Sequence, residues 1–193
     1  ENLIREIDEE MYKKIMDNRT VEGADARKTA AEVGLAAIKY GDLSNQASKD
    51  YIFDVDRFTS FEGNTGPYIL YTIVRIKSIL KKYAENGGNA EGAKILEAGA
   101  ILDPVNDSQK NLMLQLTGFG ATVENAFEEK APHKICAYIY EVSNAFNSFY
   151  HETKILSEED EAKKSGYIAL LNLAKKVLET CIDLLGFTAP ERM

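Results

Sequence analysis

Helical periodicity runs through almost the whole chain and is the feature that most limits its possible folds. Residues 2–17 carry apolar side chains three or four positions apart, and the same spacing returns in residues 23–42. Alternation with a period of two, the mark of a half-buried β-strand, is scarce. The sequence therefore predicts an all-α fold, an antiparallel bundle of about six to eight helices.

Caps, prolines and glycines divide the rest of the chain. Asn64-Thr65-Gly66-Pro67 predicts a helix start, because a capping side chain precedes a proline suited to the first turn. We expect this helix to end near Tyr83, before the Asn-Gly-Gly-Asn run at 86–89. Residues 43–63 are expected to form an ordered connector. Further helices are expected over residues 90–102, 106–117, 120–129, 132–150 and 158–186.

Composition narrows the class of protein. The two cysteines, Cys136 and Cys181, lie among apolar helical residues, which favours buried thiols of a reduced, cytoplasmic protein. No apolar run approaches the about 20 residues that a membrane-spanning helix needs, so no membrane partner is expected. The formal net charge of −8 disfavours general binding to nucleic acids.

Catalytic and metal-binding patterns are missing, and we predict neither a catalytic residue nor a metal ligand. His133 and Cys136 are only two ligands, whereas zinc needs three or four. Gly118 and Gly120 fit a turn between helices better than a phosphate loop, which would follow a strand. The acidic run 158–161 is typical of a solvated first turn, where negative charge favours the helix dipole.

The helix that begins near Asn64 carries the most informative pattern. At 100° per residue, one of its faces is apolar and must point to the core. Tyr68, Tyr71, Arg75 and Lys82 lie on a second stripe, more than a quarter-turn away. Rings and a guanidinium outside the core suit unstacked RNA bases and phosphates. Residues 61–84 carry a net charge of +3, so the local charge permits such binding.

Two alternatives to RNA contact stay open for this stripe. Tyrosines at helical spacing more often pack against a neighbouring helix. They could also form the surface of a helical scaffold that binds a protein partner. The predicted core has members on three helices: Ile73, Ile76, Leu80, Phe146, Phe149, Val177 and Leu184.

From this helix onwards the sequence resembles arginyl-tRNA synthetases. Residues 61–71 read FEGNTGPYILY and are followed by Arg75, as at that family's junction into its helical anticodon-binding domain. Upstream, residues 34–43 and 54–57 are similar to the preceding segment of the family. Downstream, Pro132-His133, Phe149-Tyr150 and the ending Pro190-Glu191-Arg192-Met193 match in the same order, so the resemblance covers the whole chain.

The resemblance implies a class I ligase that joins arginine to its tRNA with ATP and magnesium. The catalytic domain would precede Glu1, so this segment alone would be inactive and hold no cofactor. Residues 1–60 would be linker helices and a connector, and residues 61–193 the anticodon-binding domain. The partners would be arginine tRNA and the catalytic domain of the same chain, in a monomeric, cytoplasmic enzyme.

The resemblance also implies site residues. Carried over by position, the anticodon-loop contacts would be Tyr68, Tyr71, Arg75, Tyr150 and Met193 with its terminal carboxylate. One departure is clear: the family usually has Ala-Arg-Leu before its last helix, whereas this chain has Lys164-Ser165-Gly166-Tyr167-Ile168. No site residue is assigned to the connector 85–110.

Overall fold

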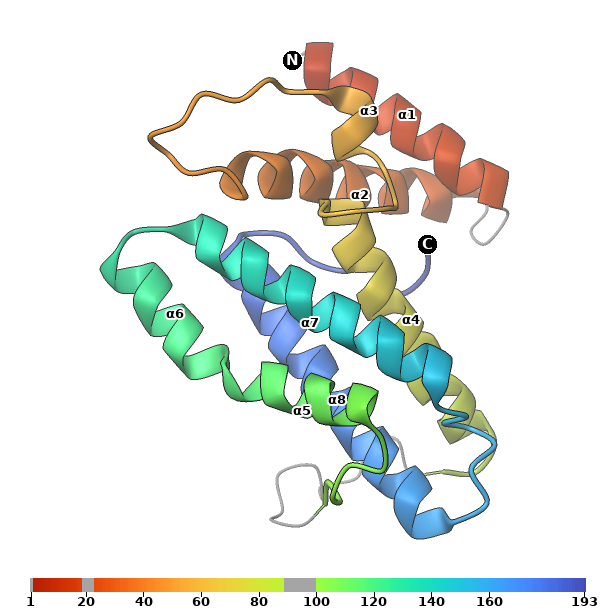
Figure 1. The fold of residues 1–193 in the computed structure, drawn as a ribbon. Helices are drawn as coiled ribbons and strands as arrows, with labels where there is room; N and C mark the ends of the chain where they lie inside the picture. Colours follow the sequence, from red (N-terminus) through yellow and green to blue (C-terminus); the bar gives the residue numbers. More distant parts are fainter. Residues whose placement is uncertain (1, 19–22, 89–99) are drawn as a thin grey trace.

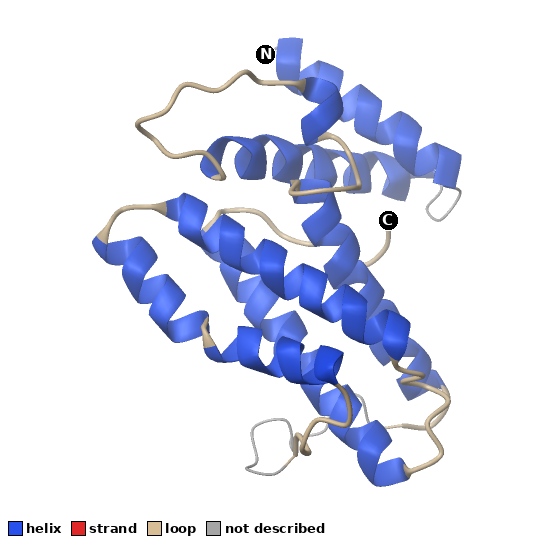
Figure 2. Cartoon of the chain, in the orientation of Figure 1, coloured by secondary structure: helices blue, strands red, loops and turns tan. Residues whose placement is uncertain are grey.

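The computed structural model describes residues 2–18, 23–88 and 100–193, and its secondary structure within these ranges is helical (Figures 1 and 2). This confirms the predicted all-α class. The helices in chain order are α1 (Asn2–Asn18), α2 (Gly23–Leu43), α3 (Val55–Phe58), α4 (Gly66–Glu85), α5 (Asp107–Thr117), α6 (Phe119–Glu128), α7 (Pro132–Glu152) and α8 (Glu161–Leu184).

Two groups of helices meet at α4. Helices α1 and α2 pack side by side as a hairpin with α3 beside them, and α4 leads from this hairpin into the bundle (Figure 1). There α4 contacts α7 and α8, while α5 and α6 cover another side of α7. Helix α8 runs opposite to α7, and the chain after it passes behind α4 and ends beside that helix (Figure 1). Helix α4 therefore joins both groups, and a smaller contact between α2 and α7 adds to this connection.

The start of α4 is fixed by its sequence and by close packing. Thr65 is the N-cap, and its side chain accepts a hydrogen bond from the Tyr68 backbone N–H. Pro67 lies in the first turn, where its missing N–H leaves no hydrogen bond unmade. Gly66 lies directly against α2, where a Cβ would overlap the Ala36 carbonyl. The predicted helix start is correct because its caps need only neighbouring residues.

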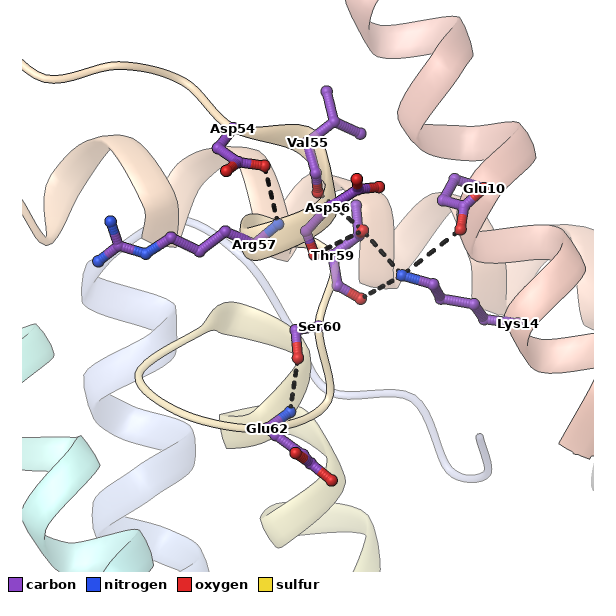
Figure 3. Close-up of polar contacts among 9 residues, drawn as sticks. All are labelled: Glu10, Lys14, Asp54, Val55, Asp56, Arg57, Thr59, Ser60 and Glu62. Atoms are coloured by element: carbon purple, nitrogen blue, oxygen red, sulfur yellow. Dashed lines mark hydrogen bonds and ion pairs between the residues drawn. The ribbon is translucent and has the colours of Figure 1, made fainter.

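The connector 43–63 contains the short helix α3 and is held against α1 (Figure 3). Asp54 caps α3 by accepting a 3.1 Å hydrogen bond from the Arg57 backbone N–H. Lys14 of α1 donates to the Thr59 carbonyl oxygen at 3.2 Å and to its hydroxyl at 2.9 Å, and it pairs with Glu10 at 3.5 Å. The segment that enters α4 is thus fixed to the hairpin.

Most of the predicted helices are present in the structure, and one predicted helix is largely untested. The helix predicted over 90–102 lies mainly outside the described residues, and residues 100–102 are not helical. The acidic run 158–161 leads into α8, and the Asp160 carboxylate caps the backbone N–H groups of residues 162 and 163. Within the described ranges, none of the helices combines the length and apolarity needed to cross a bilayer.

Both cysteines are buried and are not joined in a disulfide, as the sequence indicated. Burial raises the pKa of the Cys136 thiol to about 12, and burial has the same effect on the pKa of Cys181. Both side chains are therefore neutral thiols at physiological pH, where they pack as small apolar groups.

The core prediction is confirmed at six positions and is wrong at Leu184. Leu184 is 55% exposed at the last position of α8. The buried face of this last part of the helix is centred on Leu178, Cys181 and Leu185, with Val177 at its edge. Leu184 lies about 20° beyond Val177 at 100° per residue, at the point where the helix ends. The six confirmed residues are Ile73, Ile76, Leu80, Phe146, Phe149 and Val177.

The exposure of Leu184 predicts that its truncation has little effect on stability. Leu184→Ala should change the free energy of unfolding by no more than about 0.5 kcal/mol, because the side chain is already largely in water. Val177→Ala, seven positions earlier on α8, is the buried comparison and should lose more. Urea denaturation followed by circular dichroism measures both. A loss of 2 kcal/mol or more in Leu184→Ala, on the order of a core leucine, would contradict the corrected core.

Candidate nucleic-acid interface

Three of the predicted site residues form one cluster on α4 and α7. The guanidinium carbon of Arg75 lies 4.7 Å from the centre of the Tyr71 ring and 5.3 Å from the centre of the Tyr150 ring. Both distances are within the range of a cation–π interaction. Tyr71 and Tyr150 are 40% and 38% exposed, so both rings can be reached from solvent. This cluster combines aromatic surface with a fixed positive charge.

Asn147, one turn before Tyr150 on α7, connects this cluster to Tyr68. The Arg75 guanidinium donates a 2.7 Å hydrogen bond to Asn147 Oδ1. The Asn147 amide donates to the Tyr68 hydroxyl at 2.9 Å, and that hydroxyl donates to Asn144 Oδ1 at 2.8 Å. These hydrogen bonds fix the position of the Arg75 side chain, because the Asn147 amide oxygen accepts from Arg75 while its amide nitrogen donates to Tyr68.

Asn147 is not among the site residues predicted from the sequence, although a signal was present. Asn147 precedes the predicted contact Tyr150 by three positions, which places both on one face of α7. Its partners Tyr68 and Arg75 lie more than 70 residues away in the sequence. Only the packing of α4 against α7 makes these contacts, so the pattern on one helix could not reveal them.

Tyr68 belongs to the layer beneath the cluster. It is half-buried, and its ring packs edge-on against Tyr140 with 5.8 Å between the ring centres. Burial raises the pKa of its hydroxyl, and the hydrogen bond from Asn147 opposes that change. Tyr68 therefore supports the cluster with a neutral, hydrogen-bonded hydroxyl and exposes less of its ring than Tyr71 does.

Met193 lies on the neighbouring flank of α4 and is buried. It lines an open cavity of about 720 Å³ together with Val74 and Ser78 of α4, two positions that lie within about 60° of Tyr71 around the helix. Most of the charged side chains around this cavity are basic: Lys77, Lys81, Lys82 and Arg192, against Glu85 and Glu191. Tyr71 and Arg75 of α4, with Tyr150 of α7 beside them, and Met193 of the C-terminal segment thus border two adjacent flanks of α4.

The interface carries positive charge on a chain that is acidic as a whole. The stripe of α4 continues from Arg75 to the exposed Lys82, and the cavity beside it adds Lys81 and Arg192. A local basic surface with accessible aromatic rings is typical of sites that bind single-stranded nucleic acids. Tyr68 is largely used in contacts within the bundle, as the packing alternative expects, whereas Tyr71 and Tyr150 are accessible to a partner.

Comparison with known proteins identifies the family. The sequence profile described as "DALR anticodon binding domain" matches residues 69–193, more than half of the chain. The chain belongs to the DALR anticodon binding domain family. Its DALR domain begins within α4, close to the first of the predicted contacts. The boundary expected between residues 60 and 61 stays a prediction.

Two relatives align with the whole length of this chain. The chain is 64% identical over 199 residues to an arginine–tRNA ligase of Agathobacter rectalis, covering 100% of this chain and 33% of that protein. It is 50% identical over 193 residues to an arginine–tRNA ligase of Alkaliphilus oremlandii, covering 100% of this chain and 32% of that protein. The chain therefore spans about a third of the length of the curated relatives it matches.

Solved structures agree with the DALR assignment. The arginyl-tRNA synthetase of Thermus thermophilus superposes with a TM-score of 0.85 at 28% identity, covering 100% of this chain and 32% of that one. The arginyl-tRNA synthetase of Plasmodium falciparum gives a TM-score of 0.82 at 25% identity, covering 100% and 33%. The resemblance found in the sequence, including the helices that precede the DALR domain, is confirmed.

Proposed function

We propose that this chain binds the anticodon loop of arginine tRNA through the cluster on α4 and α7. Tyr71, Arg75 and Tyr150 are the principal contacts, supported by Tyr68 and by Met193 on the adjacent flank. The observation that carries this proposal is the position of the Arg75 guanidinium between two solvent-accessible tyrosine rings. The similarity to arginine–tRNA ligases over the full length of the chain supports the choice of tRNA.

The chemistry of the cluster fits a single-stranded loop. The rings of Tyr71 and Tyr150 offer stacking surfaces for bases that are splayed out of the loop. The Arg75 guanidinium can form two parallel hydrogen bonds to a phosphate or to a base edge. Met193 and Val74 supply apolar surface to a base beside them, while Lys81 and Lys82 can contact the backbone.

We further propose that the chain is part of a monomeric, cytoplasmic ligase that joins arginine to its tRNA. In this proposal, ATP and magnesium bind to residues outside this sequence, and the 193 residues alone do not activate arginine. The role of the present chain is to select the tRNA by its anticodon and to orient it. Binding energy from contacts remote from the reacting groups can contribute to rate as well as to affinity.

Chemical footprinting of arginine tRNA bound to the chain tests this proposal. We expect protection of the anticodon-loop nucleotides and no protection of the acceptor end. The Tyr71→Ala variant is the control, because it should lose the protection while it stays folded. Protection confined to another part of the tRNA, or none at concentrations where the complex forms, would contradict the proposal and favour a protein partner for this face.

The hydrogen bond between Asn147 and Arg75 leads us to expect that Asn147 holds Arg75 in place before RNA binds. Asn147→Ala should weaken binding of the anticodon stem-loop by about 2- to 12-fold, the equivalent of one hydrogen bond, because Arg75 loses its fixed position. Fluorescence anisotropy of a labelled stem-loop measures this change. Asn144→Ala is the matched control, since Asn144 bonds to Tyr68 and not to Arg75. Equal losses in the two variants would contradict a specific role for Asn147.

A further inference from the structure

Lys77 of α4 has an unusual set of partners for a lysine on a helix surface. Its ammonium group donates hydrogen bonds to the backbone carbonyls of Ala189 at 3.2 Å and Pro190 at 3.4 Å. It also pairs with Glu191 at 2.7 Å and with Glu179 of α8 at 3.4 Å. The side chain is 14% exposed. Three of the four partners belong to the C-terminal segment, residues 185–193, which follows α8.

The C-terminal segment has no helix of its own and depends on contacts with the rest of the chain. Gly186 has a φ of +82°, a left-handed conformation that turns the chain away from α8. Lys39 of α2 donates to the Gly186 carbonyl at the beginning of the segment. Phe187, Pro190 and Met193 are buried. Lys77 supplies the polar contacts of the second half, immediately before Met193.

We infer that Lys77 is a positioning residue, which fixes the C-terminal segment on α4 and so holds Met193 in the wall of the cavity beside Tyr71 and Arg75. This inference rests on the proposed function, because it assigns Lys77 a role in RNA binding through Met193. Lys77 itself need not touch the RNA. Its ammonium group has four oxygen partners within the protein for three N–H donors, so its hydrogen-bonding capacity is already used.

The surroundings of Lys77 indicate that its removal would leave no carboxylate buried without a partner, so the bundle should stay folded. Glu191 and Glu179 have side chains that are 85% and 37% exposed, so water can hydrate both carboxylates when the lysine is removed. The hydrogen bond from Lys77 lowers the pKa of the Glu191 carboxyl, so this pair is fully ionised at neutral pH. The pair would be lost only as the pH falls through the lowered pKa.

The first test observes Met193 without RNA. The chain has four methionines, so a methyl-labelled sample of the unmodified chain gives four signals. Each lysine-to-methionine variant adds a fifth signal, so a Met193→Leu substitution made in every background identifies the Met193 signal. In Lys77→Met we expect the Met193 methyl signal to move to the position of a solvated methionine. Lys164→Met is the matched control, because Lys164 of α8 is 16% exposed, pairs with Glu161 at 2.6 Å and does not line the cavity that Met193 lines. It should leave the signal unchanged.

The second test measures binding of the anticodon stem-loop to the same variants. Lys77→Met should weaken binding by about 2- to 12-fold, the range for ordering one flexible side chain on association. In a Met193→Ala background the same substitution should add less than about 2-fold, because both changes act through one contact. Lys77→Arg should restore part of the affinity, since it keeps the charge and several N–H donors.

The outcomes separate the two proposals. An unmoved Met193 signal in a folded Lys77→Met variant would overturn the inference whether or not RNA binds. If Lys77→Met does not fold, Glu191→Ala replaces it, because Glu191 is the exposed ion-pair partner of Lys77. This variant should move the Met193 signal in the same direction. A moved signal with unchanged affinity would overturn the link to RNA. Failure of the unmodified chain to bind the stem-loop would refute the proposed function, while the methyl signal still tests the position of the segment.

Discussion

Phe149→Ala should lower the free energy of unfolding by about 3–5 kcal/mol, the largest effect we expect from a single substitution in this chain. Phe149 has no exposed surface, and its ring packs edge-on against Tyr167 of α8 with 5.7 Å between the centres. Truncation to alanine removes apolar surface from the contact between α7 and α8 and leaves a cavity there. Urea denaturation followed by circular dichroism measures the loss.

The next residue on α7 supplies the matched control. Tyr150 is 38% exposed and lies beside Arg75, so Tyr150→Ala should cost less stability than Phe149→Ala and should reduce RNA binding instead. Two neighbouring aromatic residues would then separate folding from function. A Phe149→Ala variant with the urea midpoint of the unmodified chain would show that the core is assigned incorrectly.

Tyr71→Ala and Arg75→Ala should each weaken binding of the anticodon stem-loop by about 1–3 kcal/mol, or roughly 5- to 140-fold. Tyr71→Ala removes a stacking surface, and Arg75→Ala removes the charge and the planar donor group. Both side chains lie outside the core, so thermal melting should change little. Anisotropy titrations at several salt concentrations, together with thermal melts, give both quantities.

The salt dependence identifies the partner of Arg75. If the guanidinium contacts a phosphate, Arg75→Ala should flatten the dependence of affinity on salt, because one fewer counterion is released on binding. If it contacts a base edge, the salt dependence should stay the same and discrimination between anticodons should fall. Arg75→Lys keeps the charge and loses the planar group, so it should separate these two cases. Variants that melt several degrees lower and bind normally once folded would show that the cluster only packs.

Local sequence patterns were sufficient for the longer described helices and for the stripe on α4. The start of α4 follows from the Thr65 cap and Pro67, and the stripe of Tyr68, Tyr71 and Arg75 follows from the geometry of a single helix. Helix α3 was not predicted, because four residues are too few to show a helical period. Leu184 was misplaced because periodicity cannot indicate where a helix loses its neighbours at its end.

The contacts between helices required the structure. Asn147 meets Arg75 only because α7 packs against α4, and Lys77 meets Glu191 only because the C-terminal segment turns back after Gly186. The resemblance implied that Tyr71 and Met193 both contact the anticodon loop, and this stays a prediction. In the structure the cluster and the cavity lie on adjacent flanks of α4, and Lys77 connects the C-terminal segment to that helix.

The central claim, recognition of an anticodon by the cluster on α4 and α7, is tested most directly by exchanging the anticodon of the RNA. The unmodified chain is titrated with the arginine anticodon stem-loop and with a stem-loop that differs only in its three anticodon nucleotides. Each mismatched nucleotide should cost about 1–3 kcal/mol where it is read by direct contact, so the exchanged stem-loop should bind at least about 5-fold more weakly. Equal affinity for the two RNAs at moderate salt would contradict the account.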